Sequence, residues 1–236
     1  MGCGKNIMDA NRIKKYFSQK PHTVSTIIAV ALACIGFAII ILLPGHFTPF
    51  GLALMFVGAI LFLALSLQIK DSELSEAAKE VLAKFREAFE YEFIFRDTRK
   101  LHQAELNGVH HKDPVYESSY LASGDGLLTR RGGDGKIRTS VYQCVGILME
   151  ESYICIGTQD FSLIGGEETK PTLMKMAYGE LSHVALGESI PQMHLVTMGV
   201  YAADGTCLMN FQMRADAQTD DLVADINAKI AKHREE

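Results

Sequence analysis

Hydrophobic residues are distributed unevenly along the chain, and two long apolar runs stand out in its first third. Residues 24–43, VSTIIAVALACIGFAIIILL, and residues 51–69, GLALMFVGAILFLALSLQI, contain no charged side chain. A helix rises about 1.5 Å per residue, so roughly twenty apolar residues span a hydrocarbon core of about 30 Å. A signal peptide does not fit, because the first run is too long, lacks a small-residue cleavage site and is followed by a second run. The pattern predicts a two-helix transmembrane hairpin over residues 24–69.

Charged residues flank this hairpin asymmetrically. Residues 1–23 carry five basic side chains against one acid, the connection at 44–50 carries none, and basic residues follow the second run. Lysine and arginine near span ends stay on the cytoplasmic side. We therefore expect an integral membrane protein, of a bacterial inner membrane or an equivalent one, with both termini cytoplasmic. Ala29 and Ala33 are four residues apart, which permits close approach of the two helices.

A helical pattern follows the second apolar run. Apolar residues recur at spacings of four and three with charged residues between them: Leu74, Ala78, Val81, Phe85 and Ala88. This periodicity predicts an amphipathic helix within a juxtamembrane stalk over residues 70–106. The apolar face either forms a coiled coil or packs on the chain's own domain. Packing is favoured, because two heptads are too few to indicate a coiled coil.

Residues 107–236 have the pattern of short strands and turns. The segments GLLTRR, KIRTSVYQCVGILM, YICIGTQ, FSLIGG, HLVTMGVYA and CLMNFQM are rich in branched and aromatic residues and are separated by turn formers. From Asp216 a final amphipathic helix is predicted, with one apolar face made by Leu222, Val223, Ile226 and Ile230. The pattern predicts an α+β cytoplasmic domain: a small antiparallel β-barrel or curved sheet capped by the C-terminal helix.

The order of these segments resembles the pleckstrin-homology (PH)-like folds, especially the bacterial PH and GRAM groups. VGILMEESYICIG at 145–157 is similar to their central hairpin. MKMAYGELSHVALGE at 174–188 resembles their segment in which a strand leads into a set pattern of tyrosine, glutamate, leucine and valine, here Tyr178, Glu180, Leu181 and Val184. HLVTMGVYAADGTCLMNFQM and the helix from Asp216 resemble their closing hairpin and C-terminal helix. The resemblance covers about residues 107–232 and implies a PH-like barrel. The PH-like core fold does not need residues 91–120. This segment is expected to form either an extra strand or a surface that packs against a partner.

Composition narrows the class of partner. Residues 71–236 carry 17 basic and 27 acidic side chains, whereas nucleic-acid binding requires a broad basic surface. We expect no nucleic-acid partner. The five cysteines form no CxxC pair, and small buried thiols in a reducing compartment are expected. A cross-strand disulfide between Cys144 and Cys155 is the disfavoured alternative.

No pattern indicates catalysis. RRGGDGKIR lacks the spacing and the following helix of a phosphate-binding loop. His102, His110 and His111 form the one histidine cluster but lack the spacing of zinc ligands, so we interpret them as a solvated loop. No nucleophile elbow occurs. We expect no catalytic residues, no metal site and no cofactor, and hence a protein that is not an enzyme.

The most basic short segment is RRGGDGKIR, residues 130–138. GGDG is typical of a hairpin turn, which places four cations on the adjoining strands: Arg130, Arg131, Lys136 and Arg138. These four are the predicted lipid-binding residues. The family resemblance implies such a role for the first hairpin, and cations near an anionic leaflet contribute about 1 kcal/mol each. The alternatives are a solvated hairpin or salt bridges to acidic groups of the chain's own stalk.

The segment DANRIKKYFSQKPH at 9–22 has two interpretations. It is either an interfacial amphipathic helix with Ile13, Tyr16 and Phe17 on one side, or a basic flank of the first span. Together these features predict a membrane-anchored binding or scaffold subunit that presents its domain to a cytoplasmic partner or to anionic headgroups. Membrane lipids and other protein subunits are the expected partners, with a homo-oligomer left open. An accessory subunit of a membrane enzyme or transporter, or an enzyme with an unrecognised site, is the alternative.

Overall fold

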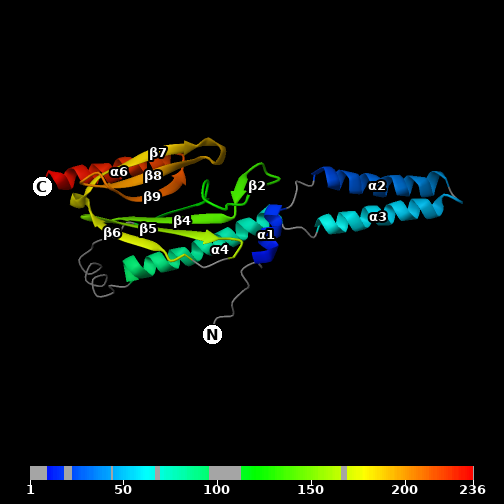
Figure 1. Cartoon of the computed structure of the whole chain (residues 1–236), viewed down its shortest axis with the longest axis horizontal. Helices are drawn as coiled ribbons and strands as arrows, with labels where there is room; N and C mark the ends of the chain where they lie inside the picture. The colour runs from blue at the N-terminus through cyan, green and yellow to red at the C-terminus, as the bar shows by residue number, and fades with distance from the viewer. Residues whose placement is uncertain are drawn as a thin grey trace, which may run out of the picture.

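A computed structural model describes residues 10–18, 23–43, 45–66, 70–95, 113–165 and 169–235. The molecule is elongated, with a helical hairpin at one end and an α+β domain at the other (Figure 1). Helix α1 (Ala10–Ser18) lies between these two parts. The C-terminus lies at the end of the domain that is far from the helical hairpin.

Two apolar helices form the hairpin, as predicted. They are α2 (Thr23–Leu42) and α3 (Thr48–Ser66), and both are long and apolar enough to cross a membrane. Their large side chains point outward: Leu42 is 74% exposed and Phe56 is 71% exposed. The core helix of a soluble protein has most of its surface buried, whereas only 11% of each apolar window is buried here.

The two helices pack through small residues. A Cβ atom on Gly36 would lie 2.6 Å from the carbonyl oxygen of Gly51, and one on Gly58 would lie 2.8 Å from that of Ala29. The backbones therefore approach too closely for side chains at these points, as in other small-residue helix pairs. Ala29, on the predicted contact face, is fully buried. The glycines add to the alanine pair that the sequence indicated.

The domain contains antiparallel strands in three groups. One sheet has the order β1-β4-β5-β6, with β1 (Val115–Tyr120), β4 (Val141–Met149), β5 (Tyr153–Ser162) and β6 (Thr172–Ala177). A second has β7 (Leu181–Ile190), β8 (Leu195–Ala202) and β9 (Cys207–Arg214). The third is a two-stranded hairpin of β2 (Thr129–Arg131) and β3 (Ile137–Thr139). Helix α6 (Ala217–Arg234) follows, and short helical turns occur at Tyr91–Phe95, Tyr178–Glu180 and Pro191–Met193.

The strand segments predicted from local pattern do not include β6 or β7, and two of them differ from the observed strands. FSLIGG is not a separate strand, because β5 continues to Ser162 and the chain then turns. KIRTSVYQCVGILM is divided into β3 and β4 at Ser140, whose backbone N–H donates to the carbonyl oxygen of Leu128 at 2.8 Å. Of the segment 91–120, residues 115–120 form a strand of the main sheet, while 96–112 lie outside the described residues.

The main core lies between the two larger sheets and α6. Ile147 and Ile156 from one sheet, with Met198 and Phe211 from the other, belong to one buried cluster. The predicted apolar face of α6 joins the same cluster: Leu222, Ile226 and Ile230 are buried, and Val223 is partly buried. Asp216 caps this helix by accepting a hydrogen bond from the backbone N–H of Thr219. The docked C-terminal helix is thus confirmed.

The predicted barrel is wrong, because the sheets do not close. Among the described strands, no ladder joins β1 to β9 or β6 to β7. Side-chain amides bridge the first of these seams. The Gln212 backbone N–H donates to Gln143 Oε1 at 2.7 Å, the Ala122 N–H donates to Gln212 Oε1 at 3.1 Å, and Gln143 Nε2 donates to Asp160 Oδ1 at 2.8 Å. Both glutamines are buried, so these bonds satisfy groups that a closed barrel would pair in a ladder.

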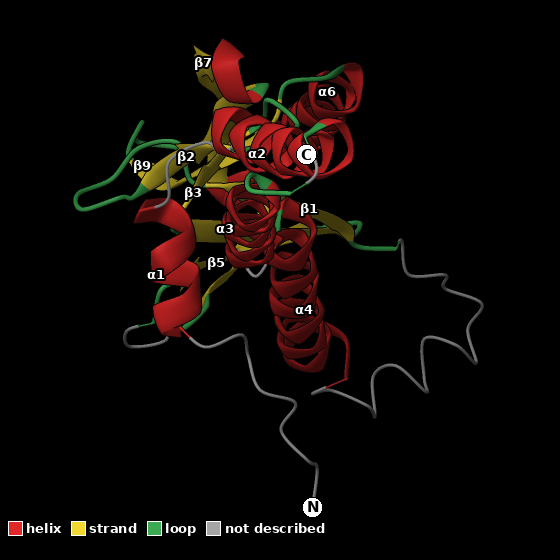
Figure 2. Ribbon diagram, turned by 90° about the vertical axis from the view of Figure 1, so that its right-hand side faces the viewer, coloured by secondary structure: helices red, strands yellow, loops and turns green. Residues whose placement is uncertain are grey.

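Helix α4 (Asp71–Glu90) packs on the outer face of the four-stranded sheet. Phe89 lies over two glycines that are opposite each other, Gly146 on β4 and Gly157 on β5. A Cβ on either glycine would lie within 3 Å of the Phe89 ring. Of the two interpretations of the stalk, packing on its own domain is therefore the one observed (Figure 2).

Cys144 and Cys155 are free and buried. Cys144 is opposite Gln159 and Cys155 is opposite Leu148, so the two thiols are four residues out of register. At about 3.3 Å per residue this offset is roughly 13 Å, beyond the reach of a disulfide. Burial raises the pKa of each thiol to about 12, which makes both unreactive.

The amide seam generates a stability prediction. Gln143→Leu leaves the buried N–H of Gln212 without its acceptor, so we expect a loss of about 1–3 kcal/mol in the free energy of unfolding. Asn210→Leu, at an exposed position on β9, is the matched control and should change it by less than about 0.5 kcal/mol. Denaturant unfolding of the full chain in detergent measures both. Equal effects of the two changes would show that the seam contributes nothing specific.

Candidate functional site

The end of the domain next to α2 and α3 brings α1 onto α4. Ile13 and Tyr16 of α1 are almost fully buried and share a cluster with Leu74 of α4 and Leu163 after β5. The segment is an amphipathic helix, but its apolar face contacts the domain. That face is therefore not available to lie in a membrane interface, and the interfacial interpretation is wrong for Ile13 and Tyr16. Lys14 and Lys15 on the opposite face are exposed.

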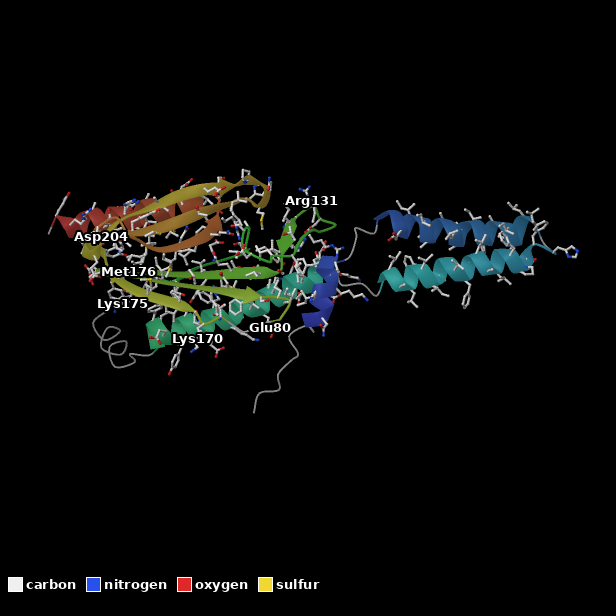
Figure 3. All side chains as sticks on the ribbon, in the orientation of Figure 1. Glu80, Arg131, Lys170, Lys175, Met176 and Asp204 are labelled. Atoms are coloured by element: carbon white, nitrogen blue, oxygen red, sulfur yellow. The ribbon has the colours of Figure 1, made fainter. Side chains whose placement is uncertain are left out.

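The basic segment forms the β2–β3 hairpin, called the basic hairpin below, and GGDG makes its turn. The N–H of Gly135 donates to the carbonyl oxygen of Gly132 at 3.1 Å, and Gly135 has a φ of +78° that favours glycine. Figure 3 shows Arg131 at the end of the domain that faces α2 and α3, with Asp204 at the opposite end. The basic hairpin is thus a membrane-proximal element if the helices cross a bilayer.

Arg138, one of the four predicted lipid-binding residues, is buried. Its guanidinium donates to both oxygens of Asp134, at 2.8 and 2.7 Å, and lies 3.9 Å from Asp71 of α4. These hydrogen bonds lower the pKa of Asp134 to about 2 and raise that of Arg138. The salt bridge to the stalk, which was the alternative interpretation, is therefore present for Arg138.

Arg130 is also engaged within the molecule. Its Nη1 donates to the backbone oxygen of Tyr16 at 2.6 Å, and its guanidinium lies 4.3 Å from the centre of the Tyr16 ring. Stacking of this kind combines a cation–π contact with a hydrogen bond. Arg130 therefore joins β2 to α1, which precedes the apolar hairpin.

Asp71 connects these elements. Its carboxylate accepts hydrogen bonds from the Tyr16 hydroxyl at 2.6 Å and from the Gly133 N–H at 2.8 Å. Burial and this hydrogen bond raise the pKa of Tyr16. Any side chain on Gly132 would collide with Arg138 and Asp71. Tyr16, Asp71, Gly133, Asp134 and Arg138 are called the Asp71 network below.

The remaining two predicted cations, Arg131 and Lys136, are exposed. Together with Lys14, Lys15 and Lys70 they form a group of exposed basic residues on α1, the start of α4 and the basic hairpin. The structure thus divides the four predicted cations into two that hold the fold together and two that face solvent.

A cavity of about 570 Å³ opens beside the basic hairpin. It lies between β1, the hairpin and the turn from β7 to β8, and three cations line it: Lys136, Arg138 and Arg214. Ser118 and Ser119 of β1 contribute hydroxyl groups. This concave surface, of mixed polar and apolar lining, is at the same end of the domain as the exposed cations.

Sequence reasoning missed Tyr16, Asp71 and Arg214 as parts of this region, because each depends on a distant contact. His102, His110 and His111 lie outside the described residues. Within the described ranges, no group of three histidine, cysteine or acidic side chains could hold a metal ion. Comparison of the chain with protein-family models, curated proteins and solved structures finds no match.

The Asp71 network predicts an acid-sensitive contribution to stability. The pKa of Asp134 is about 2, below its ordinary value of 3.8, so its stabilising effect is complete above about pH 4 and is lost as pH falls towards 2. Because 40% of the side chain is exposed, we expect at most about 1 kcal/mol. Asp134→Asn should remove this part of the pH dependence, measured by denaturant unfolding between pH 2 and 7. Asp125→Asn, in the preceding loop, should preserve it, and an unchanged slope in Asp134→Asn would contradict the assignment.

Proposed function

We propose that this chain is a membrane-anchored, non-enzymatic binding module whose domain rests its basic end on anionic lipid headgroups. Helices α2 and α3 cross the bilayer, with residues 10–18 and 70–235 on the cytoplasmic side. The remainder of the domain is presented to a cytoplasmic protein partner. The observation that carries the proposal is the docking of α1 on α4 next to the exposed cations.

Exposed apolar surface supports membrane insertion. The outward side chains of α2 and α3 include Ile27, Phe37, Phe56 and Leu63, each about half exposed or more. Soluble monomers rarely expose contiguous apolar patches larger than a few hundred Å². Neither apolar window contains an acidic or basic side chain, and such helices satisfy their backbone hydrogen bonds internally. Lipid is the environment that fits both properties.

The contact between α1 and α4 supports the topology. Helix α1 precedes the first apolar helix and α4 follows the second, yet Tyr16 donates a hydrogen bond to Asp71. Two segments in direct contact lie on one side of a membrane, so the intervening helices must cross it an even number of times. This argument is independent of the positive-inside rule and favours the same arrangement.

The length of the connections supports headgroup contact. Only four residue steps separate Ser66, the end of α3, from Lys70. At 3.3–3.6 Å per step this connection reaches at most about 14 Å. A headgroup layer is about 5–8 Å thick on each side of the hydrocarbon core. The start of α4, and the basic hairpin bound to it through Asp71, therefore stay close to the bilayer surface.

The charge distribution gives this arrangement an orientation. Residues 71–236 are acidic as a whole, while Lys14, Lys15, Arg131 and Lys136 are exposed near the hairpin end. Each cation near an anionic leaflet contributes about 1 kcal/mol within a Debye length of about 8–10 Å. The acidic remainder is repelled by the same leaflet and remains free for a partner.

We extend the proposal to the fold family. A four-stranded and a three-stranded antiparallel sheet, with a C-terminal helix that packs on β7 and shares their core, are compatible with the resemblance to PH-like and GRAM-like domains. The open seams and the inserted basic hairpin are this chain's own features. A PH-like identity would favour binding over catalysis.

Cysteine labelling tests the topology. In a background in which the native cysteines are replaced by serine, His46→Cys lies in the turn between α2 and α3, and Ser18→Cys and Ser123→Cys lie at exposed positions on the domain side. We expect a membrane-impermeant maleimide to label position 46 in intact cells. Positions 18 and 123 should react only after permeabilisation. Labelling of 18 or 123 from outside would overturn the topology.

Lipid retention tests the headgroup contact. The full chain in nanodiscs of equal phosphatidylglycerol and phosphatidylcholine should retain phosphatidylglycerol preferentially, as measured by native mass spectrometry. Arg131→Gln with Lys136→Gln should lower this preference several-fold at low salt, because each cation contributes about 1 kcal/mol. Lys170→Gln with Lys232→Gln, which removes two exposed cations elsewhere, is the charge-matched control. Equal losses in the two double variants would contradict a specific contact.

A further inference from the structure

We propose that the outer edge of β6 binds an extended, acidic segment of a cytoplasmic protein partner, which joins the four-stranded sheet as an added strand. The proposal deepens the proposed function and rests on it only for the cytoplasmic location of this edge. The ability of the edge to bind a strand rests on the hydrogen bonds of the domain itself.

The edge strands of the two larger sheets are β1, β6, β7 and β9, and β6 differs from the other described ones. β1 and β9 meet at the seam that the buried glutamines bridge. The edge of β7 is capped by α6, because the Asn227 side chain accepts a hydrogen bond from the Val184 N–H and donates one to the Val184 carbonyl oxygen, both at 2.8 Å. An amide in this position replaces a neighbouring strand.

The pairing of β6 with β5 determines which main-chain groups of β6 point outward. The Tyr178 N–H donates to the carbonyl oxygen of Ser152 at 3.2 Å. Alternate residues of an antiparallel strand bond to opposite sides, so Met176, two residues before Tyr178, also bonds towards β5. Leu173 and Lys175 therefore direct their N–H and C=O groups away from β5.

These outward groups have no partner in the described part of the chain. No hydrogen bond from a described residue reaches the outward main-chain groups of Leu173 or Lys175. The carboxylate of Glu180 accepts a hydrogen bond from the Ala177 N–H at 3.3 Å and so closes the end of the edge. An unpaired row of donors and acceptors is a template for another strand.

The side chains of β6 do not shield the edge. A lysine on an edge strand often prevents pairing, but the Lys175 ammonium lies 3.7 Å from the centre of the Tyr153 ring on β5. The Leu173 side chain also lies back over β5, since a Cβ on Gly157 would be 2.7 Å from it. β6 pairs with β5 without a register shift, whereas the pairing of β7 with β8 has two. The edge is thus regular and open.

The residues around the edge indicate the chemistry of the added strand. Lys170 and Lys175 are exposed within a domain that is acidic as a whole. A carboxylate opposite Lys175 forms a favourable cross-strand pair. On the core side, Met174 is only partly buried, and an apolar side chain beside it completes its burial. An extended segment that alternates apolar and acidic residues fits both faces.

A partner protein fits this edge better than a second copy of the chain. β6 runs along the long axis of the molecule, as α2 and α3 do (Figure 1). An antiparallel pair of two β6 edges places the helical hairpins at opposite ends, which two copies anchored in one bilayer cannot adopt. Figure 3 shows Lys175 and Met176 in the part of the domain away from α2 and α3, so a bilayer leaves the edge accessible.

The test measures residue-resolved amide hydrogen exchange of the full chain in detergent. In the chain alone, the amides of Leu173 and Lys175 should exchange at least about tenfold faster than those of Met174 and Met176, which bond to β5. The probe is a synthetic peptide of alternating valine and glutamate at millimolar concentration. It should slow exchange at Leu173 and Lys175 about tenfold when it is in about tenfold excess over its Kd. The same peptide methylated on every backbone nitrogen should give no protection.

Two variants at one position separate main-chain pairing from charge. Lys175→Pro removes an outward N–H but no bond to β5, a change that an edge strand tolerates, and should abolish the protection at Leu173. Lys175→Gln keeps the N–H and should lower the protection only a few-fold, as loss of one cross-strand ion pair predicts. Lys175→Glu should instead favour a peptide with lysine in place of glutamate. Thermal melting confirms that each variant is folded.

The outcomes separate this proposal from the proposed function. Equally slow exchange at Leu173 and Met174 in the chain alone, or equal protection by the methylated peptide, overturns the open edge. Protection that rises with protein concentration in the absence of peptide assigns the edge to a second copy and overturns the partner segment. Labelling of positions 18 and 123 from outside overturns the cytoplasmic topology but leaves the exchange result unaffected.

Discussion

The arrangement of the whole chain depends on the hydrogen bonds of one carboxylate, that of Asp71. This residue is the first of α4, and it accepts hydrogen bonds from Tyr16 before the apolar hairpin and from Gly133 in the basic hairpin. A partly buried carboxylate is costly unless it is paired, and Arg138 supplies the charge at 3.9 Å. Segments more than 50 residues apart are thereby fixed to one another directly beside α2 and α3.

This constraint explains why the four cations of RRGGDGKIR have two different roles. Arg130 and Arg138 are directly opposite each other in the β2–β3 ladder, so their side chains leave the same face of the hairpin. That face meets α1 and α4, where Tyr16 and Asp71 lie beside the two arginines, and Asp134 of the hairpin turn binds Arg138. Arg131, one residue along the strand, leaves the other face and is exposed. The alternation of the strand divides structural from surface cations, which a count of basic residues does not do.

Local patterns predicted the elements well and their contacts poorly. The apolar runs, the α6 face and the GGDG turn follow from periodicity and turn chemistry within a few residues. The open seam could not be predicted, because Gln143 and Gln212 are 69 residues apart and each is an ordinary polar residue in a strand. Likewise, Gly146 and Gly157 acquire a role only when Phe89 lies across them. The Asp71 network could not be predicted from the sequence for the same reason. Each of its residues is also compatible with an exposed position, and only the fold brings them into contact.

Two connections at one end of the domain restrict its motion more than either connection alone. Helix α4 follows α3 closely, and α1, which leads into α2, is docked on the same end of the domain. A domain held by one short linker can pivot about it, whereas two points of attachment remove most of that freedom. On the proposed function, the entropy lost when the domain is oriented is thus largely lost already on folding. Cation–lipid attractions of about 1 kcal/mol each would then suffice to select an orientation. If α2 and α3 cross a bilayer, the two attachments and the charge asymmetry place the same face of the domain towards it.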